Sequence, residues 1–73
     1  MSEPAGLTPR ETEVLSLMAN GLSDKLIAAR LSIARSTVSN HVTIILLKLD
    51  AANRTEAVAI AIRDGLITPP ASR

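Results

Sequence analysis

Residues 23 to 49 read SDKLIAARLSIARSTVSNHVTIILLKL and contain two helical patterns separated by a short break. Ile27, Ala28 and Leu31 fall on one stripe of a short helix that begins near Ser23. Residues 32 to 34 interrupt this period, and a longer helical pattern follows them. The stretch therefore predicts a helix-turn-helix.

The second helix of this pair has two chemically different sides. On a helical wheel of about 100° per residue, its apolar side holds Val38, Val42, Ile45, Leu46 and Leu49. Its outward side holds Ser39, Asn40, Thr43, Ile44 and Leu47. Small hydrogen-bonding side chains near the start of a helix suit the DNA major groove, where base edges display donors and acceptors. The same periodicity also fits a helical pair that only packs, so periodicity does not decide between the two interpretations.

The composition excludes several classes of protein. The chain has 73 residues, enough for one small domain, and it contains no Phe, Tyr or Trp on which single-stranded nucleic acid could stack. It has no cysteine and one histidine, His41, which argues against a disulfide framework, a thiol nucleophile or a metal site. The largely apolar run at 42 to 47 is too short for a bilayer, and the N-terminus lacks the features of a signal peptide. We expect a cytoplasmic protein without a cofactor or a membrane partner.

The charge of the chain is unevenly distributed. Its formal net charge of +1 is low for a protein that would lie against phosphates. Acidic residues gather near the N-terminus, at Glu3, Glu11 and Glu13. Basic residues belong to the predicted helix-turn-helix, at Lys25, Arg30, Arg35 and Lys48. The position of the basic residues in the helix-turn-helix therefore favours a phosphate-bearing partner more than the net charge of the chain does.

A further helix is predicted before this motif. Thr8 as the cap, Pro9 at the first position and Glu11 three residues after Thr8 predict a helix from about Pro9 to Asn20, which Gly21 ends. The residues expected to face its core side are Val14, Leu17, Met18 and Leu22.

A last helix is predicted after the motif. Asn53 as cap, with Glu56 reaching back, opens a helix that runs to about Asp64 and ends at Gly65. Every residue from 57 to 62 is apolar, which exceeds what one core-facing stripe needs. The excess indicates a contact with another subunit or an adjoining domain. In the alternative interpretation, exposed alanines cost little free energy and the isoleucines are ordinary surface residues.

Together these signals predict an all-α domain, a four-helix bundle with the helix-turn-helix at its centre, formed by helices two and three. We expect the domain to span residues 7 to 67, with flexible tails at residues 1 to 6 and 68 to 73.

Five segments in this order resemble a known family. They are LTPRETEVL at 7 to 15, GLSDKLIAARL at 21 to 31, STVSNHV at 36 to 42, ILLKL at 45 to 49 and NRTEAV at 53 to 58. The chain resembles the LuxR-type helix-turn-helix domain, a DNA-binding module at the C-terminus of many bacterial response regulators and quorum-sensing regulators, and sometimes a stand-alone protein. The likeness extends from about Leu7 to Ile67.

The resemblance implies roles for individual residues. The third helix would read the major groove, and the fourth would be a dimerisation helix. The positions that match base contacts in the family are Ser39, Asn40 and Thr43. Phosphate contacts are expected at Lys25, Arg35, Thr37 and Lys48, and the dimer interface at Ala59, Ile60, Ile62 and Arg63. His41 also matches a frequent family histidine, but its wheel position indicates packing at the flank of the core.

The chain also departs from the family pattern. Many relatives have Lys or Arg where this chain has Ser39, a polar residue at Ile44, a basic residue at Leu47 and Glu at Leu26. Each missing cation removes one phosphate contact and lowers DNA affinity at physiological salt. Ile44 and Leu47 would then contact thymine methyl groups, weaken non-specific DNA binding, or bind a different partner.

The leading hypothesis is a dimer that binds double-stranded DNA sequence-specifically and regulates transcription, as the effector domain of a response regulator or as a stand-alone relative. Such a dimer would read a pseudo-palindromic operator with half-sites about one helical turn apart. The alternative is a protein-interaction module with reduced DNA affinity that pairs with a related regulator. An enzyme is not expected, because no catalytic constellation is visible. Further candidate partners are an upstream receiver or ligand-binding domain and RNA polymerase.

Overall fold

The computed structural model describes residues 6 to 69, and within them the chain forms four α-helices and no strand. The helices are α1 Pro9–Ala19, α2 Asp24–Leu31, α3 Arg35–Leu49 and α4 Arg54–Arg63. The predicted all-α fold class and the helix-turn-helix, formed by α2 and α3, are confirmed. Most of the predicted tails, residues 1 to 5 and 70 to 73, lie outside the described residues.

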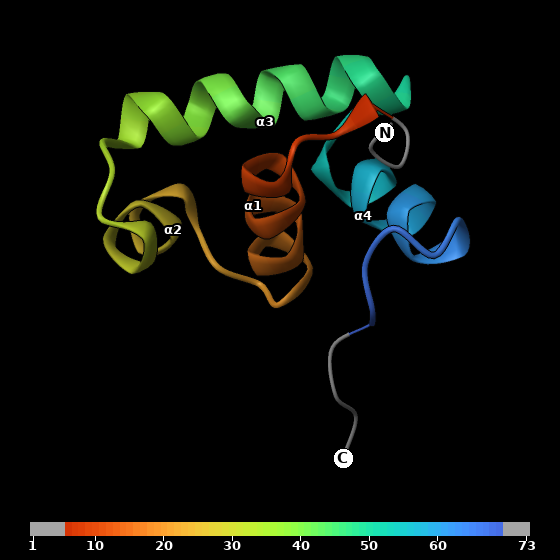
Figure 1. The fold of residues 1–73 in the computed structure, drawn as a ribbon, viewed down its shortest axis with the longest axis horizontal. Coiled ribbons are helices and arrows are strands. Elements are labelled where there is room, and N and C mark those ends of the chain that lie inside the picture. The colour runs from red at the N-terminus through yellow and green to blue at the C-terminus, as the bar shows by residue number, and fades with distance from the viewer. Residues whose placement is uncertain (1–5, 70–73) are drawn as a thin grey trace.

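Helix α3 organises the molecule. It runs along one side and packs against each of the other three helices, with α2 below its N-terminal half and α1 below its middle (Figure 1). Helix α4 lies below its C-terminal half (Figure 1). One long side of α3 therefore faces away from the bundle. None of the described helices is long and apolar enough to cross a membrane.

The side-chain caps explain where the flanking helices begin. At α1 the predicted capping box is present: the Glu11 N–H donates to Thr8 Oγ1 (3.1 Å), and the Thr8 N–H donates to Glu11 Oε1 (2.9 Å). At α4, the Glu56 N–H donates to Asn53 Oδ1 (2.9 Å), as predicted. The return bond is different, because Glu56 Oε1 accepts from the Ala52 N–H and not from Asn53. We attribute this to the more extended backbone at Asn53, where φ is −159° against −78° at Thr8, which turns the N–H of Asn53 away from the helix.

The core lies between α3 and the other helices. Its fully buried large side chains are Leu7, Val14, Leu15, Ile27, Val38 and Ile45. Val14 and Met18 of α1 are buried as predicted, and Leu17 and Leu22 are partly buried against the core. The prediction omitted Leu15, which is fully buried. Helix α1 packs against α2, α3 and α4, and so its buried arc is wider than a single stripe. On α4 the buried side chains are small, Ala57 and Ala61, which lets the helix approach the core closely.

Helix α3 ends at a strained residue. Asp50 follows its last turn with a left-handed backbone (φ 54°), and the Ala51 N–H then bonds to the Leu46 carbonyl at 2.9 Å. Glycine is the residue that usually occupies this position because it has no Cβ to clash. Asp50 also places a negative charge at the negative end of the helix dipole.

Replacing Asp50 by glycine should therefore stabilise the domain by about 1 kcal/mol, which raises Tm by roughly 4 to 8 °C for a domain of this size. The control is Asp50→Asn, which removes the charge but keeps a side chain and should give a smaller gain. Thermal unfolding followed by circular dichroism measures both. A Tm for Asp50→Gly at or below that of the parent chain would contradict the argument.

Candidate nucleic-acid interface

The outward side of α3 presents the residues predicted to touch base edges. Ser39, Asn40 and Thr43 are all exposed, while Val38 and Val42 point into the core. The three residues lie within one turn, at positions i, i+1 and i+4, so a single surface could meet them at once. The structure thus exposes the three predicted base-contact residues together on α3.

The N-terminus of α3 is open. It begins after Ala34, whose methyl side chain cannot accept a hydrogen bond, whereas the other described helices are capped by Thr8, Ser23 and Asn53. Its first-turn N–H groups form the positive end of the helix dipole, which is suited to a phosphate. In that turn Arg35 is exposed and Thr37 is half-buried. The open end and Arg35 together make this turn the most favourable place for an anion on α3.

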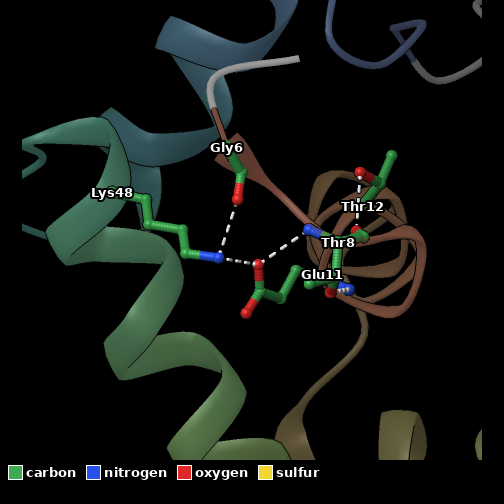
Figure 2. A network of polar contacts seen from close by, with 5 residues as sticks. All are labelled: Gly6, Thr8, Glu11, Thr12 and Lys48. Carbon is green, nitrogen blue, oxygen red and sulfur yellow. Dashed lines mark hydrogen bonds and ion pairs between the residues drawn. The ribbon is translucent and has the colours of Figure 1, made fainter. Parts of the chain in front are cut away.

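Lys25 and Lys48, the other predicted phosphate contacts, lie in different surroundings. Lys25 is exposed in the first turn of α2. Lys48 instead points toward α1, where its Nζ donates to Glu11 Oε1 and to the Gly6 carbonyl, both at 2.7 Å (Figure 2). Two of its three N–H donors are therefore used inside the protein, and one remains for a partner.

Glu11 is the buried centre of this network. Its side chain is 7% exposed, and its Oε1 accepts from both Lys48 and the Thr8 N–H (Figure 2). Burial alone would raise the pKa of Glu11, but the hydrogen bond from Lys48, the bond from the Thr8 backbone and the positive charge of Lys48 together lower it. The carboxylate is thus held in its charged form, and it ties the start of α1 to the end of α3.

A second polar junction joins three helices. Asp24, the first residue of α2, accepts a hydrogen bond from Ser39 Oγ of α3 at Oδ2 (3.3 Å). Its other oxygen, Oδ1, lies 2.6 Å from Arg54 Nη2 at the start of α4. That second contact is an ion pair. The exposed outer face of α3 is therefore connected to α2 and α4 through one carboxylate.

Large apolar side chains are exposed on the helix-turn-helix. Ile44 is 40% and Leu47 is 76% exposed on α3, and Leu26 is 54% exposed on α2. Ile44 and Leu47 follow Asn40 and Thr43 by one turn each, so they extend the same side of α3 toward its C-terminus.

The predicted dimer residues divide into two groups. Ala59 and Arg63 are exposed, one turn apart on α4. Ile60 and Ile62 are only partly exposed, because they pack against the core. The apolar excess of α4 is thus smaller at the surface than the sequence indicates.

Sequence reasoning missed both polar junctions. From the sequence, Glu11 is expected in a capping box and among the acidic residues near the N-terminus, and no contact is expected for Asp24. A signal for the first was available: Glu11 lies three, four and seven residues before Val14, Leu15 and Met18, on the buried stripe of α1. A carboxylate on a buried stripe needs a cation. The ion pair between Asp24 and Arg54 joins residues 30 positions apart and has no comparable signal.

Comparison with known proteins identifies the family. The profile described as "Bacterial regulatory proteins, luxR family" matches residues 5 to 61. The chain belongs to this family. It is 48% identical over 67 residues to the transcriptional regulatory protein YxjL of Bacillus subtilis, covering 92% of this chain and 30% of YxjL. It is 51% identical over 57 residues to the transcriptional regulatory protein DesR of the same species, covering 78% of this chain and 29% of DesR.

Two solved structures share the fold. The transcription factor GerE superimposes with a TM-score of 0.81 at 34% identity, over 85% of this chain and 92% of GerE. The response regulator ChrA, from a heme-sensing two-component system, also gives 0.81 at 41% identity, over 84% of this chain and 30% of ChrA. The chain thus spans less than a third of YxjL, DesR and ChrA, and nearly the whole of GerE.

Proposed function

We propose that this luxR-family domain binds double-stranded DNA sequence-specifically and thereby regulates transcription. The observation that carries the proposal is the outer side of α3, where Ser39, Asn40 and Thr43 are exposed together next to an uncapped helix N-terminus. A major groove admits one α-helix and offers both donors and acceptors to such side chains. We assign base contacts to these three residues.

Phosphate contacts are assigned to Lys25, Arg35 and Thr37, with a smaller contribution from Lys48. Lys25 and Arg35 are exposed cations, and Thr37 lies in the open first turn of α3. Lys48 is expected to add less, because Glu11 already neutralises its charge. Because two of these assigned contacts, Lys25 and Arg35, are cations with no ion pair in the described structure, we expect modest affinity for random DNA and a shallow dependence on salt.

Replacing Lys25 by alanine should weaken binding to all DNA sequences alike. Loss of one phosphate contact is expected to reduce the slope of log K against log salt by about one unit, because one fewer counterion is released. Lys25→Arg keeps the charge and should keep the slope. Fluorescence anisotropy titrations at several salt concentrations, on an operator and on a scrambled duplex, measure both. A Lys25→Ala chain that loses discrimination but keeps the parental slope would contradict the assignment.

We further propose that the domain binds as a homodimer, with Ala59 and Arg63 at the contact and Ile60 and Ile62 beneath it. A two-fold dimer would present two α3 helices to half-sites about one helical turn apart. The similarity to part of the much longer response regulator ChrA supports a role as the effector domain of a response regulator. RNA polymerase is a further proposed partner. We also propose that the protein acts in the cytoplasm.

One observation favours a second function. Ile44 and Leu47 are exposed where a DNA-binding surface would gain from polar or basic residues. These side chains fit a protein-interaction module that pairs with a related regulator and has reduced DNA affinity. The substitution Leu47→Lys separates the functions: it should strengthen DNA binding in a DNA-binding domain and abolish pairing in an interaction module.

A further inference from the structure

The hydroxyl of Ser39 is the one proposed base-contacting group whose proton is committed to another side chain of the described structure. It donates to Asp24 Oδ2 at 3.3 Å across the junction between α2 and α3. The neighbouring Thr43 hydroxyl donates to a backbone carbonyl of its own helix, that of Ser39, at 3.0 Å. A serine hydroxyl has one proton and two lone pairs, so this bond leaves Ser39 with acceptor capacity only.

The carboxylate of Asp24 accepts this hydrogen bond from a partly buried position in the first turn of α2. Its side chain is 20% exposed, and Arg54 of α4 lies 2.6 Å from its other oxygen. At 3.3 Å this hydrogen bond is longer than is usual between a hydroxyl and a carboxylate, but its acceptor carries a charge that the neutral base oxygens lack. We therefore expect the Ser39 hydroxyl to keep donating to Asp24 when the alternative acceptor is the neutral O4 of thymine or O6 of guanine.

We propose that Asp24 is a positioning residue that sets the base preference of Ser39, and this rests on the proposed DNA-binding function. A hydroxyl that can only accept a hydrogen bond matches the amino groups of adenine (N6) and cytosine (N4) in the major groove, and mismatches the keto oxygens of thymine and guanine. A free serine hydroxyl would pair with either kind. Asp24 thus narrows the reading of one base position to adenine or cytosine without touching the DNA.

The test is a binding selection from randomised duplexes with the parent chain and the variants Ser39→Ala, Asp24→Ala and Arg54→Ala. The base position that loses its preference in Ser39→Ala should prefer adenine or cytosine in the parent chain. In Asp24→Ala that preference should fall by roughly threefold to tenfold, the value of one hydrogen bond, while other positions keep theirs. Removal of a negative charge near DNA raises the affinity for all sequences equally. This effect therefore cancels when affinities for different bases at one position are divided by each other.

Arg54→Ala is the matched control, because it breaks the same ion pair but leaves the carboxylate beside Ser39. It should lower Tm and keep the base preference. The inference is overturned if the parent prefers thymine or guanine at that position, if Asp24→Ala leaves the preference unchanged or alters all positions alike, or if Arg54→Ala broadens it equally. If the parent chain enriches no motif at all, the proposed DNA-binding function is overturned. This result differs from those above, in which the chain binds DNA and only the role of Asp24 fails.

Discussion

Replacing Lys48 by methionine should lower the free energy of unfolding by about 2 to 4 kcal/mol, because it leaves the Glu11 carboxylate buried without its cation. The value is set below the usual cost of breaking a fully buried pair, since the Lys48 side chain is 32% exposed and water can partly replace it. A domain of this size has a total stability on the order of 4 to 11 kcal/mol. Tm should therefore fall by more than about 10 °C in thermal unfolding.

The double variant Glu11→Gln, Lys48→Met is the control for this ion pair. Without the carboxylate charge at position 11, loss of the Lys48 ammonium group leaves no unpaired buried charge. The double variant should therefore lose less free energy of unfolding than the two single variants lose in sum. If Lys48→Met melts within about 2 °C of the parent, the network of Figure 2 contributes little to stability. Lys48 would then be free to serve as a full phosphate contact.

The same ion pair makes stability depend on pH in the acid range. The pKa of Glu11 in the folded chain is lower than its ordinary value of 4.5. Its contribution is therefore fully present above pH 4.5 and is lost as the pH falls through the lower, folded-state pKa. In Glu11→Gln that part of the acid-induced loss should be absent when urea unfolding is compared between pH 6 and pH 3.

Replacing Ala59 by glutamate should abolish cooperative binding to a two-half-site operator while sparing the fold. Ala59 is exposed on α4, so the new carboxylates would meet each other across a two-fold contact. Ile60 and Ile62 are poorer test positions than the sequence indicates, because both pack partly on the core and a charge there would also destabilise the monomer. Occupancy of paired half-sites should fall at least tenfold more than occupancy of one half-site, since the second protomer no longer gains effective concentration from the first.

Gel-shift titrations on DNA with one or two half-sites measure this difference, and circular dichroism checks the fold. Ala59→Ser, which keeps a small uncharged side chain, is the matched control and should retain cooperativity. Cooperative filling of both half-sites by a folded Ala59→Glu chain would show that α4 is not the dimer surface. The exposed Ile44 and Leu47 would then be the next candidates for the contact.

Local signals account for the part of the fold that the sequence predicts. Caps at Thr8 and Asn53, glycines at 21 and 65, and the apolar periods of α2 and α3 act within one or two helical turns. The outward side of α3 follows from the same period, and so Ser39, Asn40 and Thr43 are found where they are expected. Asp50, a non-glycine residue in the left-handed region, gave no such signal.

Contacts between distant residues account for what the sequence does not predict. Lys48 looks like a surface lysine in its own helix, and only the packing of α1 against α3 brings it to Glu11 and Gly6. Asp24 meets Ser39 and Arg54 for the same reason, because three helices converge there. A family resemblance assigns roles by position and so misses which of these groups are already engaged inside the protein.

Selection from a library of randomised duplexes, with the purified chain and its Asn40→Ala variant, tests most directly whether the outer side of α3 reads DNA. The parent should enrich a two-fold symmetric motif with half-site centres about 10 base pairs apart. Asn40→Ala should lose about 1 to 3 kcal/mol of discrimination at one position in each half-site and keep the rest of the motif. Recovery of no motif by the parent, or of the same motif with equal discrimination by both chains, would contradict the assignment of this surface.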